Sequence, residues 1–209
     1  MSVKNHIQAG LLLCCLYFTP MKGEAQHFIG VREGVSTSSV LFNPARRDSA
    51  TFQALNVGLV YKYYITTWTG LQLGVNYAEK GYMLEDTTRR YRVVEIPFLS
   101  QFHAELWRFR VLANAGVYAA YHLSAKEIFK ENDKEIQRAY VFKGRDNRFE
   151  YGLHFGGGLG VMLHPFEVQF EVGYQYGLSY LLKPRYGEER MMFTHFTQLI
   201  ISAAVLIKI

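Results

Sequence analysis

The sequence predicts an all-β protein, an eight-stranded antiparallel up-and-down transmembrane β-barrel with a filled polar lumen. The first of three supporting observations is the segment 166–180, where apolar and polar residues alternate for fifteen positions. Side chains alternate across a strand with period two. Soluble strands usually run about five or six residues, whereas a membrane-crossing strand needs about nine to eleven. The other two observations are the recurrence of such segments and an N-terminal segment typical of exported proteins.

Residues 1–25 have the features of a secretory signal peptide. Lys4 gives a positive start, 9–18 form a short apolar run, and 23–25 read Gly-Glu-Ala, a small-x-small cleavage signal. The apolar run is too short for a transmembrane helix. We therefore expect residues 26–209 to form the mature barrel domain.

Both cysteines of the chain, Cys14 and Cys15, fall within this leader. A lipoprotein signal would need a small residue before the cysteine, but Leu13 stands there. The mature protein then contains no thiol, which excludes disulfides and cysteine-based metal sites.

Eight alternating segments follow the leader, and the connections between them are alternately short and long. The segments are 27–36, 51–66, 69–82, 91–104, 108–123, 148–163, 166–180 and 194–209. The connections 66–69, 105–107 and 164–165 are tight, whereas 37–50, 83–90, 124–147 and 182–193 are long and polar. Short turns at one rim and long loops at the other are typical of outer-membrane barrels.

Three local features depart from this regular pattern. Glu33 falls on the same face as Val31 and Val35, where an apolar residue is expected. Pro97 cannot donate a ladder hydrogen bond and suggests a bulge or a break. In the longest loop, we expect 139–142 to pair with 127–130 across a turn near Asn132 and Asp133. A helix over 130–137 is the competing prediction.

Alternation alone leaves open which face meets which solvent. A secreted lipocalin-like barrel would place the apolar face inside, around a ligand. Against this alternative, the polar face is rich in glycine, the aromatic residues gather near strand ends as in interfacial girdles, and the last strand ends on an apolar residue. We therefore expect Phe170 to face lipid and Gln169 to face the lumen.

The inward face carries acids and bases in nearly equal numbers. An eight-stranded barrel is only wide enough for side chains to fill it, and buried charges must be paired. The predicted lumen ionic network is Arg32, Lys62, Glu95, Arg110, Glu150, Glu167 and Glu171, with Lys80, Glu105, Arg108 and Lys208 on the same face. We expect Glu171 and Glu95 to neutralise bases that include Arg32 and Lys62. A plugged barrel of this kind is not a wide pore.

Several motifs resemble a known family. Residues 79–82 read Glu-Lys-Gly-Tyr and residues 94–98 read Val-Glu-Ile-Pro-Phe. Together with Gly-Val-Tyr-Ala-Ala-Tyr-His-Leu-Ser-Ala-Lys at 116–126, they resemble the signature of the PorT-like outer-membrane β-barrel family, over nearly all of the mature chain. The sequence departs from the family at Val117, where proline is common, and at the aliphatic end of the chain, where barrels more often have an aromatic residue.

The resemblance implies an eight-stranded barrel in the outer membrane of a Gram-negative cell, with a periplasmic N-terminus. An even strand number then places the C-terminus in the periplasm as well. It implies a structural, assembly or secretion-accessory role, the barrel-assembly machinery as a partner, and other secretion-system envelope proteins as further partners. It supplies no catalytic residues, because the family motif is structural.

A search for reaction chemistry favours structural explanations. His122, Ser124 and Glu127 are the local candidates for a hydrolase. The glycines at 156–158 lie within a predicted strand and lack the helix that a phosphate loop needs. We expect no enzymatic activity, no metal and no cofactor. The alternative function is a small outer-membrane transporter or a lipid-modifying enzyme.

The long loops are basic, and four of their arginines are candidate lipid contacts. Outer-leaflet lipid, including lipopolysaccharide, carries phosphates that arginine recognises bidentately. The candidates are Arg89, Arg90, Arg145 and Arg148. Nucleic acid is excluded as a partner because the chain is exported.

Overall fold

The computed structural model describes residues 25–43, 49–84, 87–131, 134–144, 146–181 and 193–209. Within these ranges the chain forms nine strands. They are β1 Gln26–Asn43, β2 Ser49–Tyr64, β3 Thr69–Leu84, β4 Thr87–Leu106, β5 Phe109–Glu131, β6 Lys134–Tyr140, β7 Phe149–Leu163, β8 Phe166–Gly177 and β9 Phe193–Lys208. No helix in the described ranges is long and apolar enough to cross a membrane. The predicted signal peptide lies outside them, except for its last residue.

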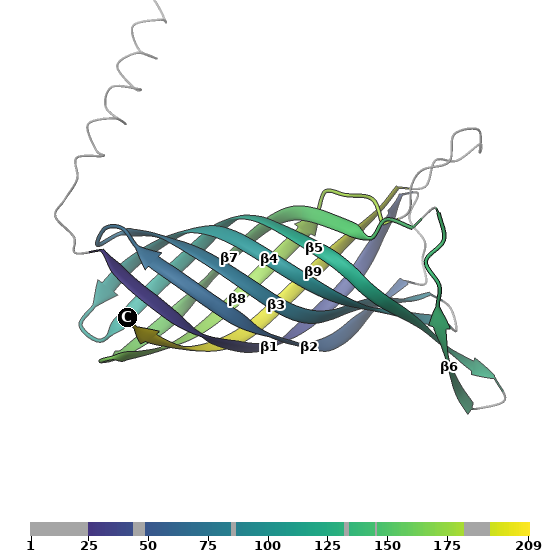
Figure 1. The fold of residues 1–209 in the computed structure, drawn as a ribbon, viewed down its shortest axis with the longest axis horizontal. Helices are drawn as coiled ribbons and strands as arrows, with labels where there is room; N and C mark the ends of the chain where they lie inside the picture. The colour runs from purple at the N-terminus through teal and green to yellow at the C-terminus, as the bar shows by residue number, and fades with distance from the viewer. Residues whose placement is uncertain (1–24, 44–48, 85–86, 132–133, 145, 182–192) are drawn as a thin grey trace, which may run out of the picture.

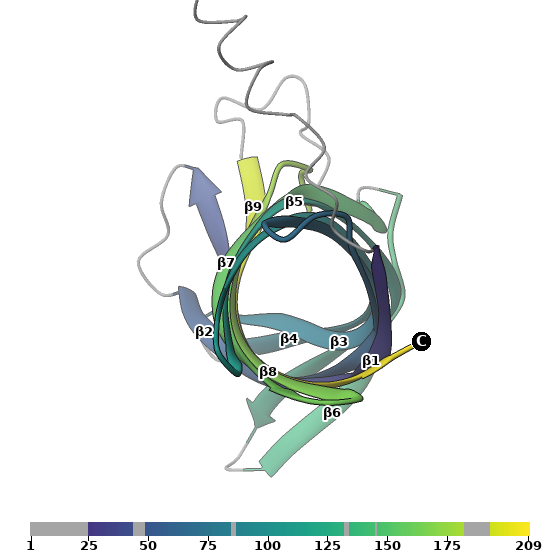
Figure 2. The ribbon, with the colours of Figure 1, turned by 90° about the vertical axis from the view of Figure 1, so that its left-hand side faces the viewer.

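Eight of these strands close into a ring. Each strand pairs antiparallel with its neighbour in the order β1-β2-β3-β4-β5-β7-β8-β9, and β9 pairs with β1. Strand β6 pairs with β5 and stands outside the ring. The end-on view shows the closed barrel (Figure 2). The prediction of an eight-stranded antiparallel barrel is confirmed.

The faces of the strands are divided as the alternation predicts. In β8, Phe170 is 59% exposed on the outer wall, whereas Gln169 is fully buried in the lumen. Leucine, valine, phenylalanine and tyrosine side chains cover the outer wall along the other barrel strands. A lipocalin-like barrel would bury these side chains instead, so the outer surface fits a hydrocarbon environment.

The two rims of the barrel differ, and we name them by their connections. The turn rim holds the tight connections 65–68, 107–108 and 164–165, together with the start of β1 and the end of β9 (Figure 1). The opposite rim, which we call the loop rim, joins the other ends of the strands. Its connections are not all long, since only two residues separate Leu84 of β3 from Thr87 of β4. The predicted division into short and long connections therefore holds only in part.

The strands reach further toward the loop rim than the sequence suggested. The predicted loops 37–50 and 83–90 are largely strand, because β1 continues to Asn43 and β4 already begins at Thr87. Alternation did not reveal these strand ends, because polar residues occur there on both faces. A strand that extends beyond the hydrocarbon layer no longer needs an apolar face.

The longest predicted loop contains a hairpin that projects beyond the barrel (Figure 1). Strand β5 runs on to Glu131 and pairs with β6, so the expected pairing across residues 132–133 is confirmed and the competing helix is wrong. The expected register is also wrong, since Glu127 pairs with Arg138 and Ala125 with Tyr140. Residues 141 and 142 lie beyond the strand.

Pro97 marks a break in the ladder, as one of the two alternatives predicted, and not a bulge, because no pairs form between residues 74–75 and 96–97. The register between β3 and β4 is the same on both sides of it, with Leu73 opposite Phe98 and Asn76 opposite Glu95. Gly74 makes room for the proline ring, because a Cβ at that position would lie 3.0 Å from Pro97 Cγ.

The register shifts at two other places, between Thr51 and Asn56 in the β2–β3 ladder and at Leu123 in β5. Arg92 pairs with Ser124, whereas the next residue, Val93, pairs with His122. Leu123 is therefore an extra residue in β5, and the phase of the strand changes beyond it.

The outer face can be tested with one substitution. Phe170→Arg would place a charge on the lipid face, which costs about 2–4 kcal/mol near the bilayer midplane. We expect its free energy of folding into lipid vesicles, measured by urea titration, to fall by at least about that amount. Gln137→Arg on β6 is the control, because this exposed residue lies outside the ring, and we expect a change of about 0.5 kcal/mol or less. Equal losses in the two variants would contradict the assignment of the faces.

Candidate functional site: the closed lumen

The lumen of the barrel contains a balanced set of buried charges. The structure buries all seven residues of the predicted ionic network, each no more than 8% exposed: Arg32, Lys62, Glu95, Arg110, Glu150, Glu167 and Glu171. Lys80, fully buried, joins them. Four bases and four acids are thus enclosed, and their formal charges sum to zero. The charges form two groups, one on the side of each rim.

The group nearer the turn rim is centred on Glu171. Its two carboxylate oxygens accept separate ion pairs, from Arg32 Nη2 and from Lys62 Nζ, each at 2.7 Å. Arg32 lies on β1, Lys62 on β2 and Glu171 on β8, so neither pair joins adjacent strands. Lys62 also donates to the side chain of Gln169. The contacts tie non-adjacent parts of the wall to one another.

Arg110 ends this group at the turn rim. Its guanidinium pairs with the buried Glu167 and, at 2.6 Å, with the half-exposed Glu105. It also lies over the ring of Tyr64, at 4.2 Å from the centroid. Gln169 links Arg110 to the Glu171 pairs, because its Nε2 donates to Glu167 at 2.5 Å. The polar contacts therefore run without a gap from the rim to Arg32.

The group nearer the loop rim is centred on Lys80, which lies between two carboxylates. Its Nζ is 2.6 Å from Glu95 and 3.0 Å from Glu150. Tyr118 donates its hydroxyl to Glu150 at 2.6 Å, and His122 Nε2 is 3.1 Å from the other oxygen of that carboxylate. These side chains come from β3, β4, β5 and β7, so this group also crosses the lumen.

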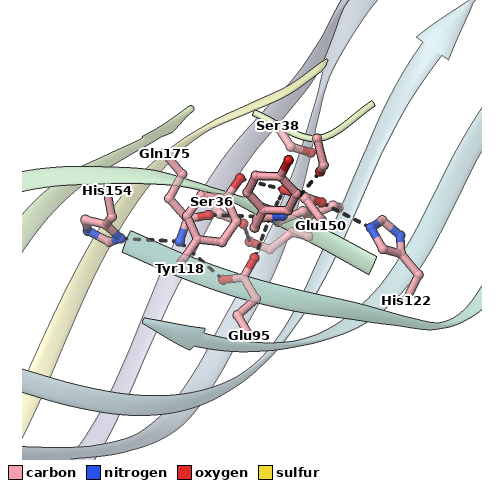
Figure 3. A network of polar contacts seen from close by, with 12 residues as sticks. Ser36, Ser38, Glu95, Tyr118, His122, Glu150, His154 and Gln175 are labelled. Atoms are coloured by element: carbon pink, nitrogen blue, oxygen red, sulfur yellow. Dashed lines mark hydrogen bonds and ion pairs between the residues drawn. The ribbon is translucent and has the colours of Figure 1, made fainter. Parts of the chain in front are cut away.

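Gln175 extends the Lys80 group toward the middle of the barrel (Figure 3). Its side-chain oxygen accepts from Lys80 at 3.4 Å, and its Nε2 is 3.3 Å from His154 Nδ1. The His154 ring occupies the space in front of Gly173, where a Cβ would lie only 2.7 Å from its Nε2. A glycine on one strand thus admits a ring from the neighbouring strand.

A small polar cavity separates the two groups. Its volume is only about 10 Å³, and it is lined by Arg32, Asn56, Asn76, Asn114, His154 and Glu171, among others. About one water molecule fits in such a volume. The middle of the lumen is therefore closed by side chains.

Apolar clusters flank the ionic groups at both rims. Toward the loop rim, Tyr82, Tyr91 and Phe196 pack with smaller apolar residues inside the barrel. Toward the turn rim, Phe28 and Leu206 belong to a second buried cluster. The prediction of a filled lumen is confirmed. The filling is apolar toward the loop rim, whereas toward the turn rim the apolar cluster lies beside the ionic residue Arg110. The sequence analysis assigned most aromatic residues to the outer wall and missed this layering.

The structure contains the expected pairs of Glu171 with Arg32 and Lys62, and Glu95 neutralises another lumen base, Lys80. One detail of the predicted network is wrong. Arg108 does not enter the lumen, because it lies in the turn before β5 and its exposed guanidinium stacks over Trp107 at 5.1 Å. The sequence analysis placed Gln169 in the lumen, but its predicted network left out four neutral or aromatic partners, which are Tyr118, His122, Gln169 and Gln175. Each lies at an inward position of the alternation, which is the signal that could have found them.

The candidate residues for a hydrolase are not brought together. His122 is buried in the lumen against Glu150, whereas Ser124 is exposed. Strict alternation would have placed both on one face, but the bulge at Leu123 separates them. The glycines at 156–158 lie within β7, where a Cβ on Gly158 would meet the backbone oxygen of Phe170 at 2.2 Å. Among the described residues, no three His, Cys, Asp or Glu side chains are grouped as metal ligands would be.

The comparisons with known proteins agree with this geometry. The model of the outer membrane protein beta-barrel domain family matches residues 24–183. The chain belongs to this family. As a member, it is an outer-membrane β-barrel protein of the Gram-negative type. None of the curated proteins compared with the chain matches it in sequence.

Solved structures with a similar fold are also outer-membrane barrels. The outer membrane protein OprG from Pseudomonas aeruginosa shares 14% identity with this barrel at a TM-score of 0.53, over 88% of this chain and 96% of that one. Neisserial surface protein A (NspA) shares 13% identity at a TM-score of 0.48, over 90% and 100% of the two chains. At such low identity the similarity to OprG shows the fold alone.

The four arginines predicted to contact lipid phosphate differ in their surroundings. Arg89 pairs with Glu127 at 2.5 Å, and Arg90 pairs with Glu79. Arg145 lies outside the described residues. Arg148 is exposed and has no carboxylate partner among them; it donates to the Leu123 carbonyl oxygen at 3.3 Å. Two of the predicted cations are therefore already neutralised by the barrel itself.

A tyrosine at the base of the β5–β6 hairpin connects this region to the loop that follows. Arg89 lies over the ring of Tyr140, at 4.3 Å from the centroid, and the tyrosine hydroxyl donates to Asp146 at 2.8 Å. Burial, and then the hydrogen bond to Asp146, raise the pKa of Tyr140 to about 12. The phenol is therefore neutral at physiological pH and available as a donor.

The shared carboxylate of Glu171 gives a testable order of stabilities. Removing one member of a buried ion pair typically costs about 3–5 kcal/mol, because a charge is left uncompensated. Glu171→Gln leaves both Arg32 and Lys62 without a carboxylate partner, whereas Arg32→Met leaves Glu171 paired with Lys62. We expect Glu171→Gln to lower the free energy of unfolding more than Arg32→Met does, in urea titrations of the barrel in lipid.

The double variant supplies the control for this order. Because the two side chains are in contact, we expect the double variant to lose less than the sum of the single losses. The control double variant, Arg32→Met with Glu150→Gln, changes one residue in each of the two separate groups. Its loss of unfolding free energy should equal the sum of the two single losses to within about 0.5 kcal/mol. Additivity of the Arg32 and Glu171 losses would contradict a direct pair.

Proposed function

We propose that this outer-membrane barrel has a structural or assembly role in the envelope, as an accessory to a secretion system of the PorT-like kind, and that it does not conduct solutes. The closed lumen is the observation that carries the proposal. The motifs at 79–82 and 94–98 supply the PorT-like part of it, and the lumen supplies the exclusion of transport.

The energetic cost of opening the lumen supports this role. A solute that passed along the axis would have to separate Lys80 from two carboxylates and Glu171 from two bases. Each separation would leave buried charge without compensation. The apolar cluster toward the loop rim adds a further barrier to water and ions. A barrel built in this way acts through its surfaces.

The proposed orientation places the turn rim in the periplasm. Short turns face the periplasm in barrels of this class, and both ends of the barrel domain lie on that rim. The N- and C-termini are then periplasmic, and the last strand, β9, is available to the barrel-assembly machinery. Other secretion-system envelope proteins are the proposed functional partners.

At the opposite rim we propose a contact with outer-leaflet lipid. Arg148 is the strongest of the four predicted arginines, since it is exposed and no carboxylate of the described residues neutralises it. Arg89 and Arg90 are weaker candidates because they already form ion pairs with Glu127 and Glu79. The phosphates of lipopolysaccharide are the chemical group that fits such a cation.

The exclusion of transport predicts electrical silence. Purified protein reconstituted into planar bilayers should give no conductance steps between pH 6 and pH 8, because the lumen charges are paired and the cavity is about 10 Å³. Insertion should be verified independently by flotation with vesicles and by protease protection of the barrel. Regular conductance steps from inserted protein would overturn the proposal and favour the small transporter.

The secretion-accessory role predicts a specific phenotype in cells. Removal of the protein should reduce the amount of secreted protein in the medium and leave the uptake of small solutes unchanged. The structural role depends on surfaces, so Glu171→Gln, if it still inserts, should restore secretion to the deleted strain. Normal secretion with impaired solute uptake would refute this role and support the alternative of a transporter.

A further inference from the structure

One carboxylate lies on the outer, lipid-facing wall of the barrel. Glu33 points outward on β1, between the outward residues Val31 and Val35. Its partners in register are Val57 on β2 and Ala203 on β9. The outward neighbours of Glu33 are therefore apolar along the strand and across it.

The position of Glu33 is deep in the hydrocarbon layer. It lies seven residues after Gln26, the first residue of β1. At about 3.3 Å per residue and a strand tilt of about 40°, this places it roughly 18 Å above the turn rim. The apolar band of such barrels is only about 25 Å tall. A charge at this depth is costly, and an ionisable residue in the membrane is a functional candidate by default.

Glu33 borders an apolar groove on the outer wall. The groove has a volume of about 590 Å³, and its lining includes Glu33, Val35, Leu55, Leu159, Phe170, Ile201 and Ala203. Its floor is low because the small side chain of Ala203 lies in register between Glu33 and Phe170. The groove thus crosses from β7 to β2, and the carboxylate lies at its edge.

The barrel itself offers Glu33 no compensation. No ion pair or side-chain hydrogen bond joins it to any of the residues that the structure describes. The register row through Glu33 continues outward through Val57, Tyr77 and Val94 on one side and through Ala203, Phe170, Leu159 and Val111 on the other. None of these residues carries a charge.

These facts restrict what can occupy the groove. Lipid acyl chains match its walls, but lipid headgroups keep their donors and cations at the membrane surface, far from Glu33. A second copy of the chain presents the same row, which contains no base. A transmembrane segment of another protein can carry a lysine or arginine at any depth, where polar contacts between segments hold membrane proteins together.

We propose that the groove around Ala203 is the docking site for a transmembrane segment of a different envelope protein, which places a lysine or arginine against Glu33. Small residues at the floor let the partner approach closely, and the ion pair fixes its depth and orientation. The inference adds two features to the proposed accessory role. The groove is the binding surface, and a membrane protein of the envelope is the partner. It rests on the outer-membrane location of the barrel and does not depend on the closed lumen.

Site-specific photo-crosslinking in cells tests the proposal. Benzoylphenylalanine replaces Phe170 in the groove or, as the control, Phe98 on the opposite part of the wall, which is similarly exposed. We expect a protein adduct from position 170 and none from position 98. Glu33→Leu should weaken the adduct about tenfold or more, and Glu33→Gln should weaken it less because it keeps a hydrogen-bonding group.

The identity of the adduct decides between the occupants. Support requires a partner that has a lysine or arginine in a membrane segment, and recovery of the adduct when Glu33→Lys is combined with the reverse change in that partner. An adduct of twice the chain mass would show a second copy, and lipid adducts alone would show that lipid fills the groove. Either result, or a protein adduct that Glu33→Leu leaves unchanged, would overturn the proposal.

The stability of the isolated barrel provides a second readout. If Glu33 serves a partner, its removal should relieve a cost in the barrel alone, so Glu33→Leu should unfold at higher urea than the native protein in lipid vesicles. A lower urea midpoint would show a structural role for Glu33 and would overturn the proposal. Conductance of the barrel would refute the closed-lumen function and leave this result unaffected.

Discussion

Charge neutrality inside a narrow lumen is the constraint on which the rest of this structure depends. Four bases and four acids lie in a space that side chains fill, so each charge must find its partner there. Lys80 and Glu171 each serve two partners. Lys80 and Glu95 lie on the adjacent strands β3 and β4, whereas the other three of these pairs cross-link parts of the wall that share no backbone hydrogen bonds. The apolar cluster toward the loop rim shields the Lys80 group.

In the role that we propose, the same closure leaves the outer surface as the part of the molecule that meets partners. A barrel without a passage can contribute to the envelope through its rims and its lipid-facing wall. The wall is uniformly apolar along the register row that contains Glu33, apart from Glu33 itself. The contrast between eight compensated charges in the lumen and the uncompensated Glu33 on the lipid-facing wall separates the residues that maintain the fold from the residue that we assign to a partner.

Much of this architecture could be predicted from the sequence, because period-two alternation and burial obey the same geometry. The closed eight-stranded ring follows from the alternation and the number of alternating segments. The outward Phe170 and the inward Gln169 needed two further signals, the glycine-rich polar face and the aromatic residues near strand ends. The choice of partners within the lumen cannot be predicted in this way, since it depends on how far the strands tilt and which side chains meet across the axis. The pairing of Glu95 with Lys80 is one example. The bulge at Leu123 has no signal in the sequence, because no proline or glycine marks it. It nevertheless decides that Ser124 points away from the lumen.

The central claim is that the lumen ammonium groups are locked in ion pairs away from water. Nitrogen-detected NMR of the protein in lipid nanodiscs measures this directly, through the exchange of lysine side-chain ammonium protons with solvent. Lys62 and Lys80 are fully buried, whereas Lys143 is exposed beyond the barrel and provides the reference. The account predicts slow exchange, with observable ammonium signals, for Lys62 and Lys80 alone of these three. Exchange as fast as that of Lys143 would show a hydrated lumen and would contradict it.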